Sequence, residues 1–495
     1  MKILLASSEI HPYSKTGGLA DMVGALAKSL ARRGHSTAVV TPFYRGIATR
    51  FPDLRRFDWE LDLAIGSRQV RGGVWTRRTE DGLTIYFIEQ PEFFDRDNLY
   101  QDNGIDYPDN AERFIFFSKS VVNLARYLPD PPELVHVQDW QTGLVPLFIH
   151  HLQTREGWGT APRTCLTIHN LAYQGVFRPA AYDLTNLPRD YFHPGGAEFH
   201  GFFNFLKTGI NFADMLTTVS PRYAREITTE QLGCGLDGVL RRRQSVLAGI
   251  LNGVDYDEWN TTDNPYLRRP FSAEEKTGKE ENKVELQKEL GLPANPAVPL
   301  FGNISRLTEQ KGIDIQLGAL EEMLSTDMQF VLLGSGSPGF EKAYTRLAQR
   351  YPGKAAIRIG FDQGLSHRIE AGSDFYLMPS RFEPCGLNQM YSLRYGTLPI
   401  VRATGGLDDS VIDIVEDPEN ANGIKFREYS ARALAKAVRK ALVLYHDSDL
   451  MAHYRANAFR RDFSWERTAA EYEQFYRRFI PEPASALVPN NPVAT

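Results

Sequence analysis

The sequence is poor in cysteine and has no long hydrophobic run. Its three cysteines, Cys165, Cys234 and Cys385, form no Cys-x-x-Cys pair of the kind found in zinc or redox sites. Thiols this scarce favour a reducing compartment over a disulfide framework. No segment approaches the roughly 18 apolar residues needed to cross a bilayer, and the first apolar stretch is too short for a signal peptide. We therefore expect a cytoplasmic protein with no membrane partner.

The chain also lacks a large excess of either charge. Lys and Arg number 56 against 61 Asp and Glu, which gives a net charge of −5 over 495 residues. Proteins that grip nucleic acid by its phosphates usually carry a basic footprint, so we expect no nucleic-acid partner. Apolar residues make up 42% and charged residues 24%, as in ordinary globular proteins. The length predicts more than one domain.

Short apolar runs alternate with longer amphipathic stretches, which is typical of βαβ units in a parallel sheet. These runs lie at residues 2–7, 37–41, 134–138 and 164–169, and again at 300–305, 329–334, 355–360 and 375–379. Between about 250 and 298 this alternation stops. The charged stretch 274–289 predicts a linker followed by a solvated helix. The sequence therefore predicts an α/β protein made of two doubly wound halves.

A glycine-bearing loop follows the first run. Lys15-Thr16-Gly17-Gly18 precedes a helical pattern that contains Asp21. Free backbone N–H groups at such a helix start suit an anionic group, and Lys15 adds a positive charge. The loop is neither a Walker A motif nor a dinucleotide fingerprint. Tight turns need glycines in any case, so a purely structural role stays open.

Two cations follow the first run of the second half. Arg306 and Lys311 come directly after residues 300–304. Ligands of open α/β sheets bind beyond the carboxyl ends of strands, where this pair can grip a diphosphate. An isolated arginine and lysine are also often simply solvated.

A literal G-x-G-x-x-G match spans residues 334–339 and supports a rival hypothesis, an NAD-dependent oxidoreductase. Asp362 is the acidic residue that could bind the ribose in that case. Pro338 lies inside the turn, however, and a lone fingerprint is weak. Gly336 then either lines a nucleotide or only forms a turn.

The most specific stretch is residues 379–401. Pro384 suits the first turn of a helix, so the N–H groups of residues 385–387 would point outward. Glu383 can accept hydrogen bonds from sugar hydroxyls. A helix start and nearby cations also predict a lowered pKa for Cys385, making it the reactive thiol, whereas Cys165 should be inert.

Five blocks carry a resemblance to a known family. Residues 15–21, 136–140, 167–175, 251–255 and 381–387 resemble the signature blocks of bacterial glycogen synthases and plant starch synthases, in the family order. This resemblance implies a GT-B fold, two Rossmann-like domains facing a deep interdomain cleft. The N-terminal domain would span 1–250 and the donor-binding domain 251–462. A helix at 463–480 would pack back on the first domain, and 481–495 should be a disordered tail.

The resemblance also implies an activity: retaining transfer of glucose from ADP-glucose to the non-reducing end of an α-1,4-glucan, with release of ADP. No cofactor is expected, and homo-oligomers are possible. The resemblance assigns catalytic roles to Arg306, Lys311, Glu383 and His169. It places Lys15, Gly17 and Gly18 at the donor, and Asp139, Asn170 and Tyr173 on the acceptor and sugar side. From their places in the loops we add Gly336, Cys385, Gly386, Leu387, Tyr391, Thr404 and Gly405 to the donor side and Asp21 to the acceptor side.

One position departs from the wider GT-B pattern. Many members carry a second glutamate eight residues after the first, where this chain has Tyr391. The ribose-binding role of that glutamate is therefore not transferred. His136 is more typical of a hydrogen-bonded structural histidine, whereas His169 at a strand end is the functional candidate.

A metal is not expected. Asp95/Asp97, Asp255/Asp257 and Asp447/Asp449 are scattered Asp-x-Asp pairs, and hard cations need converging oxygens. No carboxylate pair stands out as nucleophile and acid, which favours front-face attack by the acceptor. Outside this class, the oxidoreductase and a non-catalytic glucan-binding protein remain open. Within it, sucrose-type or trehalose-type synthesis is the alternative.

Overall fold

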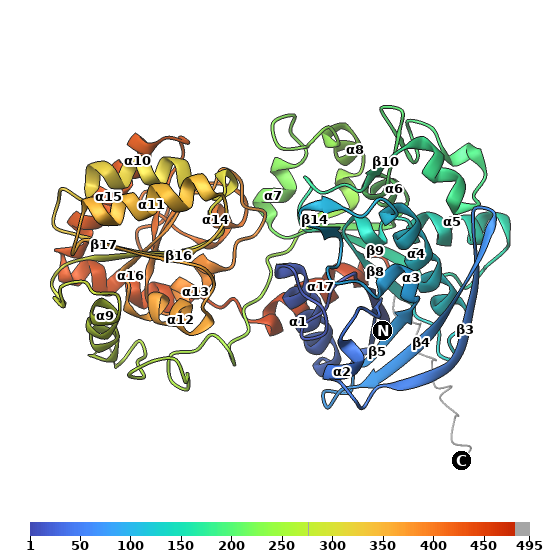
Figure 1. Cartoon of the computed structure of the whole chain (residues 1–495), viewed down its shortest axis with the longest axis horizontal. Helices are drawn as coiled ribbons and strands as arrows, with labels where there is room; N and C mark the ends of the chain where they lie inside the picture. The colour runs from blue at the N-terminus through green and yellow to red at the C-terminus, as the bar shows by residue number, and fades with distance from the viewer. Residues whose placement is uncertain (276, 481–495) are drawn as a thin grey trace, which may run out of the picture. The chain divides into compact units, whose positions relative to one another are not determined.

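The computed structural model describes residues 1–275 and 277–480, so the tail predicted at 481–495 lies outside the described residues. The chain forms two compact units (Figure 1). The first contains Met1–Thr217, Cys234–Ala248 and the chain from Thr468 onward, and the second contains Thr218–Gly233 and Gly249–Arg467.

This division differs from the predicted boundary at 250 in one segment, Thr218–Gly233, which belongs to the second unit. The reason is a set of contacts between α7 (Pro221–Glu226) and α14 (Gly405–Ser410). The Arg222 amide donates to Asp409, and Glu226 accepts from the Gly405 amide at 3.1 Å.

A nine-stranded sheet forms the core of the first unit, in the order β14-β13-β9-β8-β1-β2-β5-β4-β3. The pairings from β9 through β8, β1 and β2 to β5 are parallel, whereas β4 and β3 add an antiparallel hairpin that was not predicted. The strands are β1 (Lys2–Ala6), β2 (Ser36–Pro42), β3 (Arg55–Ile65), β4 (Arg68–Arg78), β5 (Thr84–Glu89), β8 (Leu134–Gln138), β9 (Arg163–Ile168), β13 (Met215–Thr218) and β14 (Leu247–Gly249).

The helices of the first unit follow the apolar periodicity of the sequence. In α1, Val23, Leu26, Ala27 and Leu30 recur at helical spacing and are all buried. The other helices are α2 (Ile47–Arg50), α3 (Pro91–Phe94), α4 (Asn110–Tyr127), α5 (Val145–Arg155), α6 (Phe205–Phe212) and α8 (Asp237–Arg242), and α1 spans Gly18–Arg32. Short antiparallel ladders join β6 (Gln101–Asp102) to β7 (Ile105–Asp106), and β12 (Phe202–Asn204) to β10 (Val176–Phe177) and β11 (Glu198–Phe199).

The last helix, α17 (Trp465–Arg477), begins in the second unit and ends in the first. In the first unit, its Tyr476 hydroxyl lies 2.8 Å from Nδ1 of the buried His136. The other ring nitrogen of His136 lies 2.6 Å from the Thr167 hydroxyl. His136 is therefore a hydrogen-bonded structural histidine, as its context predicted.

A six-stranded parallel sheet forms the core of the second unit, in the order β17-β16-β15-β18-β19-β20. Its helices lie on both faces, with α10, α11 and α15 on one and α9, α12, α13 and α16 on the other (Figure 1). The strands are β15 (Leu300–Ile304), β16 (Gln329–Gly334), β17 (Ala355–Ile359), β18 (Phe375–Met378), β19 (Leu398–Arg402) and β20 (Ile424–Phe426). The helices are α9 (Thr277–Glu289), α10 (Ile313–Met323), α11 (Pro338–Arg350), α12 (Gln363–Gly372), α13 (Asn388–Arg394), α15 (Ala431–Tyr445) and α16 (Ser448–Arg460).

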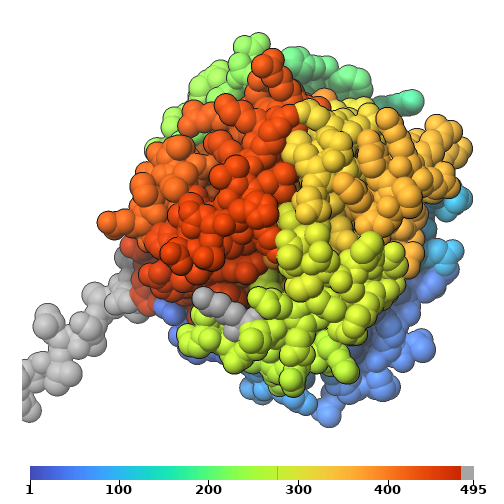
Figure 2. All heavy atoms as spheres, turned by 90° about the vertical axis from the view of Figure 1, so that its left-hand side faces the viewer, coloured from blue at the N-terminus to red at the C-terminus, as the bar shows by residue number. Residues whose placement is uncertain are grey.

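Helix α9 corrects the prediction of a solvated helix at 274–289, because one of its faces is buried. Lys283 is buried and lies 2.6 Å from Asp374, which also accepts from Arg455 at 2.9 Å. Lys279 donates to the Thr397 hydroxyl and to the carbonyl of Ala371. On the molecular surface the yellow-green residues that include α9 lie beside the orange-red C-terminal helices (Figure 2), in line with the Lys283 bond to the Tyr445 hydroxyl.

In both sheets the order of the strands reverses beside the first strand. In the first unit β1 lies between β2 and β8, and in the second β15 lies between β16 and β18. Such switch points are where open α/β sheets bind ligands, beyond the carboxyl ends of the strands. The predicted site residues follow β1, β8, β9, β15, β16, β18 and β19.

Candidate functional site

The first set of predicted residues lies beyond the carboxyl ends of β1, β8 and β9, which are neighbours in the sheet. After β1, Gly17 is the extended N-cap of α1, and no side chain caps it. Gly17 and Gly18 are exposed, so the first amides of a fifteen-residue helix face solvent. Lys15 forms an ion pair with Asp21 at 2.8 Å. The predicted donor-side lysine and the predicted sugar-side aspartate are thus direct partners.

Glu9 supports this loop, and sequence reasoning missed it. Its carboxylate is buried and accepts from the Thr16 amide at 2.5 Å and from the Thr16 hydroxyl at 2.6 Å. The Tyr100 hydroxyl donates to the same carboxylate at 2.7 Å. Tyr100 is 91 positions away in the chain, so no local pattern could have revealed the contact.

Asp139 follows β8 in a conformation that is rare for a residue with a side chain, with φ 55° and ψ −165°. It accepts from the amide of His169, the residue after β9, at 2.7 Å. Burial raises the pKa of Asp139 to about 7, and the nearby negative charge of Glu9 adds to the rise. The loops after β1, β8 and β9 therefore meet around one carboxylate that titrates near neutrality.

His169 is held as a neutral ring. Its Nε2 lies 2.9 Å from Oε1 of Gln138, which places the proton on Nε2. Burial lowers the pKa of His169 to about 3. Two more predicted residues, Asn170 and Tyr173, lie on the same loop. The Asn170 side chain accepts from the Ala172 amide, and Tyr173 is 59% exposed. An imidazole of this kind can donate or accept hydrogen bonds without carrying charge.

The second set lies beyond β15 and β18, which pair directly. Arg306 is exposed, and among the described residues no hydrogen bond or ion pair engages its guanidinium. Lys311 lies in a short 3₁₀ turn that docks against the loop after β18, since the Arg381 amide donates to the Gln310 carbonyl at 2.8 Å. Gly312, at φ 69°, has no room for a Cβ because Pro379 lies against it.

Glu383 and Lys311 form an ion pair at 2.6 Å, with side chains 7% and 19% exposed. The Ser380 hydroxyl donates to the same carboxylate oxygen at 3.0 Å. Removing one partner of such a buried pair leaves the other charge uncompensated. The two residues predicted to hold phosphate and sugar are therefore coupled electrostatically.

The stretch around Cys385 corrects two predictions. The helix begins at Asn388, not at Pro384, so Cys385, Gly386 and Leu387 lie in the loop before α13. Cys385 is 5% exposed, and burial raises its pKa to about 12. A thiol that is buried and protonated is not the reactive cysteine of this chain.

The glycines of this edge are required by close approaches between loops. A Cβ on Gly405 would lie 1.9 Å from the carbonyl oxygen of Glu383, and one on Gly336 would lie 2.5 Å from that of Leu307. Several of their polar groups also have protein partners. The Gly336 amide donates to Glu341, whereas the Gly405 amide and Thr404 hydroxyl donate to Glu226.

The rival dinucleotide fingerprint lacks its context. Helix α11 starts at Pro338, so Gly339 is inside the helix instead of in the turn. Asp362, the candidate for a ribose contact, is the N-cap of α12 and accepts from the Leu365 amide at 2.8 Å. These residues build a turn and a helix start.

Comparison with known proteins decides the family. A family model described as starch synthase catalytic domain matches residues 2–242, and one described as glycosyl transferases group 1 matches residues 284–461. The chain is 48% identical over 481 residues to the glycogen synthase of Anaeromyxobacter sp. (strain Fw109-5), covering 96% of this chain and 99% of that protein. The chain belongs to the glycogen synthase family.

Two solved structures extend this comparison. The catalytic domain of starch synthase IV from Arabidopsis thaliana, bound to ADP and acarbose, is 34% identical, with a TM-score of 0.85 and coverage of 96% of this chain and 99% of that one. Sucrose-phosphate synthase from Thermosynechococcus elongatus is 17% identical, with a TM-score of 0.58 and coverage of 96% and 98%, and shares the fold alone. As a family member the chain is a hexosyltransferase with a GT-B-like fold.

Two observations bear on other expectations for this glycogen synthase family member. Over residues 1–275 and 277–480, no three His, Cys, Asp or Glu side chains gather as a metal would require. Asp95 and Asp97 both pair with Arg45, which accounts for one Asp-x-Asp. In the same described ranges no helix is both long and apolar enough to traverse a bilayer.

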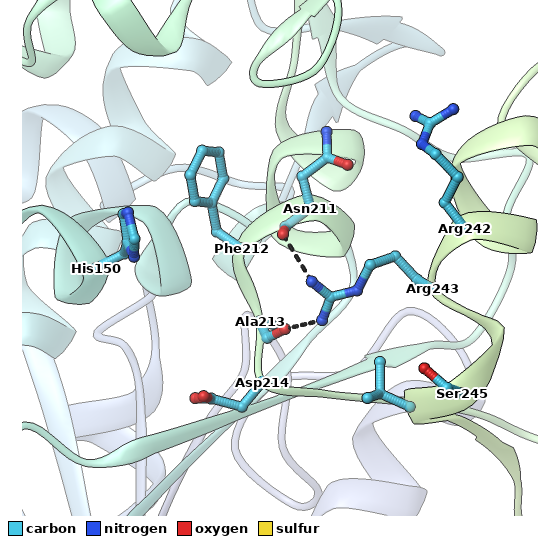
Figure 3. A pocket seen from close by; sticks show the side chains of 9 residues that line it. His150, Asn211, Phe212, Ala213, Asp214, Arg242, Arg243 and Ser245 are labelled. Atoms are coloured by element: carbon cyan, nitrogen blue, oxygen red, sulfur yellow. Dashed lines mark hydrogen bonds between the residues drawn. The ribbon is translucent and has the colours of Figure 1, made fainter.

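A separate cavity of about 620 Å³ lies in the first unit and contains none of the predicted residues (Figure 3). Arg243 donates to the carbonyls of Asn211 and Ala213 there, and so satisfies the end of α6. This arginine therefore has a structural role at the end of the helix.

Proposed function

We propose that the protein transfers glucose from ADP-glucose to the non-reducing end of an α-1,4-glucan, with retention of configuration and release of ADP. The observation that carries this proposal is the arrangement of Arg306, Lys311 and Glu383 at the switch point of the second sheet. It combines cations for a diphosphate with a buried carboxylate for sugar hydroxyls, in a chain of the glycogen synthase family.

Arg306 and Lys311 stabilise the leaving diphosphate. Cleavage of the anomeric bond adds negative charge to that group, and catalysis requires interactions that strengthen as the charge develops. Arg306 is exposed and available, whereas Lys311 must exchange its Glu383 partner for phosphate oxygens. In the first unit, Lys15 and the exposed Gly17 and Gly18 supply positive potential for an anionic group.

The adenine is held by stacking. Phe361 follows β17 and is 87% exposed as a residue, although a free phenyl ring is costly to hydrate. The preceding Gly360 amide donates to the Gly334 carbonyl at 3.1 Å, so the backbone before Phe361 lies beside the end of β16. Tyr391 stacks on Trp259 with ring centroids 3.7 Å apart, and we assign it to supporting that wall of the donor site.

The first unit contributes the acceptor and sugar side through Asp21, Asp139, His169, Asn170 and Tyr173. The neutral His169 can hydrogen-bond hydroxyls, and the exposed Tyr173 ring offers a face for a sugar ring. Glu9 and Asp139 are close, yet the Glu9 oxygens are engaged by Thr16 and Tyr100. We therefore propose front-face attack by the acceptor hydroxyl, without a covalent intermediate, cofactor or essential metal.

The test is ADP release from ADP-glucose with glycogen as acceptor, run beside UDP-glucose and beside small sugar acceptors. We expect ADP release that depends on glycogen, together with chain elongation and no response to NADH. Release with a small acceptor alone would favour sucrose-type or trehalose-type synthesis. Glycogen binding without ADP release would favour a non-catalytic glucan-binding protein. A cytoplasmic location is part of the proposal and agrees with the free state of all three cysteines.

A further inference from the structure

The loop that carries Lys15 has one buried tether. From Lys15 to Gly18 the backbone is exposed, and the only side-chain acceptor that holds a loop amide within the described residues is the Glu9 carboxylate. It takes both donors of Thr16, at 2.5 and 2.6 Å. A two-point contact fixes the direction of the loop as well as its distance from β1.

Glu9 is itself held by a third donor, Tyr100. The Tyr100 hydroxyl lies 2.7 Å from both the Glu9 carboxylate and the Ser8 hydroxyl. The Tyr100 carbonyl accepts from the Asn110 side chain at 2.9 Å, at the first residue of α4. A continuous chain of hydrogen bonds therefore runs from α4 through Tyr100 and Glu9 to Thr16, two residues before α1.

The chemistry of Glu9 is unusual for a buried acid. Glu9 is only 3% exposed, yet among the described residues no cation pairs with its carboxylate. A buried carboxylate without a counter-charge is costly unless several donors satisfy it. The fold maintains this costly arrangement next to the exposed amides of Gly17 and Gly18, where a purely structural contact could use a neutral side chain.

We propose that Glu9 is a positioning residue that sets the conformation of the Lys15 to Gly18 loop, and thereby the location of the Lys15 ammonium and of the Gly17 and Gly18 amides for glucosyl transfer. This inference rests on the proposed function for its kinetic consequence. The tether itself is independent of that function. A misplacement of about 1 Å in a group that stabilises a transition state is enough to cost about 10²-fold in rate.

The kinetic test compares Glu9→Ala, Glu9→Gln and Lys15→Ala in the full chain, with ADP-glucose and glycogen. We expect Glu9→Ala to lower kcat by about 10²-fold. Glu9→Gln should recover most of that loss, since its amide oxygen can accept from the Thr16 amide while its NH₂ donates to the hydroxyls. The double variant Glu9→Ala/Lys15→Ala should lose less than the product of the two single losses, because the Lys15 ammonium is one of the groups that Glu9 positions. Losses that multiply would overturn the proposal.

Hydrogen exchange tests the tether without any assay of activity. Glu9→Ala should speed exchange in a peptide covering residues 14–24 and leave peptides of the second unit unchanged. Glu133→Ala is the matched control, since Glu133 accepts the Lys2 amide at 2.8 Å at the other end of β1. It should change neither the exchange of residues 14–24 nor kcat. Unchanged exchange in Glu9→Ala would overturn the proposal even if the wild type proved inactive toward ADP-glucose.

A second variant covers the case in which Glu9→Ala fails to fold. Thr16→Val keeps the shape of an exposed side chain and removes only the hydroxyl donor. It should lower kcat in the same direction by a smaller factor at an unchanged melting temperature, whereas Thr16→Ser should match the wild type. Equal kcat for Thr16→Val and Thr16→Ser would show that the hydroxyl contact does not position the loop.

Discussion

Two buried carboxylates of the first unit are held differently from two of the second. In the first, the carboxylates of Glu9 and Asp139 are held by backbone amides and hydroxyls. In the second, the buried carboxylates of Asp374 and Glu383 face lysines, in the pairs Lys283–Asp374 and Lys311–Glu383. Burial raises the pKa of the Asp139 carboxylate to about 7, whereas the carboxylate of a buried ion pair keeps its charge, and the pair becomes costly when one partner is lost.

The largest effect should come from breaking a buried pair of the second unit. Lys283→Met leaves Asp374 with Arg455 as its remaining cation partner and removes a donor to the Tyr445 hydroxyl. We expect a loss of about 3–5 kcal/mol in the free energy of unfolding, measured by denaturant titration. Lys288→Met is the control on the same helix, because its pair with Glu285 is exposed and should leave the midpoint unchanged. If the denaturation midpoint of Lys283→Met equals that of the wild type, the buried ion pair does not stabilise the second unit.

The next effect concerns rate. Arg306→Ala and Lys311→Ala should each lower kcat by about 10²–10³, the scale of losing one preorganised electrostatic partner. Glu383→Ala should cost at least as much. The double variant Lys311→Ala/Glu383→Ala should be faster than the product of the single losses, because each single change strands a charge.

The control for these rates is Lys342→Ala, an exposed cation on α11 that should leave kcat unchanged. Circular dichroism must first show that each variant is folded. Unchanged kcat with a raised KM for the donor in Arg306→Ala and Lys311→Ala would mean that these cations only dock the substrate.

A smaller effect should distinguish the acids of the first unit. The pKa of Asp139 is raised to about 7 from an unfolded value near 4, so between these pH values the native state binds more protons than the unfolded state. Stability therefore falls as the pH rises from about 4 to about 7. Asp139→Asn should melt a few degrees above the wild type at pH 8 and at the same temperature near pH 4. The exposed Asp190→Asn should show no such trend, and a pH-independent difference for Asp139→Asn would refute the titration.

The smallest effect is a labelling pattern. Of the three thiols only Cys234 is exposed, whereas Cys165 and Cys385 are buried. Alkylation followed by peptide mass mapping should label Cys234 alone in the folded protein, and activity should survive. If Cys385 is modified in the folded protein, the sequence-based prediction that it is the reactive thiol would be correct after all.

The sequence predicted the parallel core well because its signals are local. The eight apolar runs coincide with β1, β2, β8, β9, β15, β16, β17 and β18 to within one residue at each end. The antiparallel hairpin was missed, although Phe57, Trp59, Leu61, Leu63 and Ile65 alternate with other residues in β3. Alternation marks a half-buried strand, and a search for continuous runs passes over it.

The predictions that failed for α9 and for Cys385 have a different origin. Helix α9 buries Lys279, Asn282, Lys283 and Gln287, so apolar periodicity gave no sign of its buried face. The Cys385 prediction failed because the loop continues to Leu387 and the thiol turns inward. The order of the strands could be expected from the fold class, but which side chains meet beyond them depends on tertiary contacts such as that of Glu9 with Tyr100.

The division of the chain also constrains how it can be made. The chain passes between the units at 217/218, 233/234, 248/249 and 467/468. During synthesis, the first unit is therefore incomplete until α17 has been made, since Tyr476 is the partner of the buried His136. No single cut yields two self-sufficient fragments. The N-terminal unit, first to be synthesised, is the last to have all of its parts.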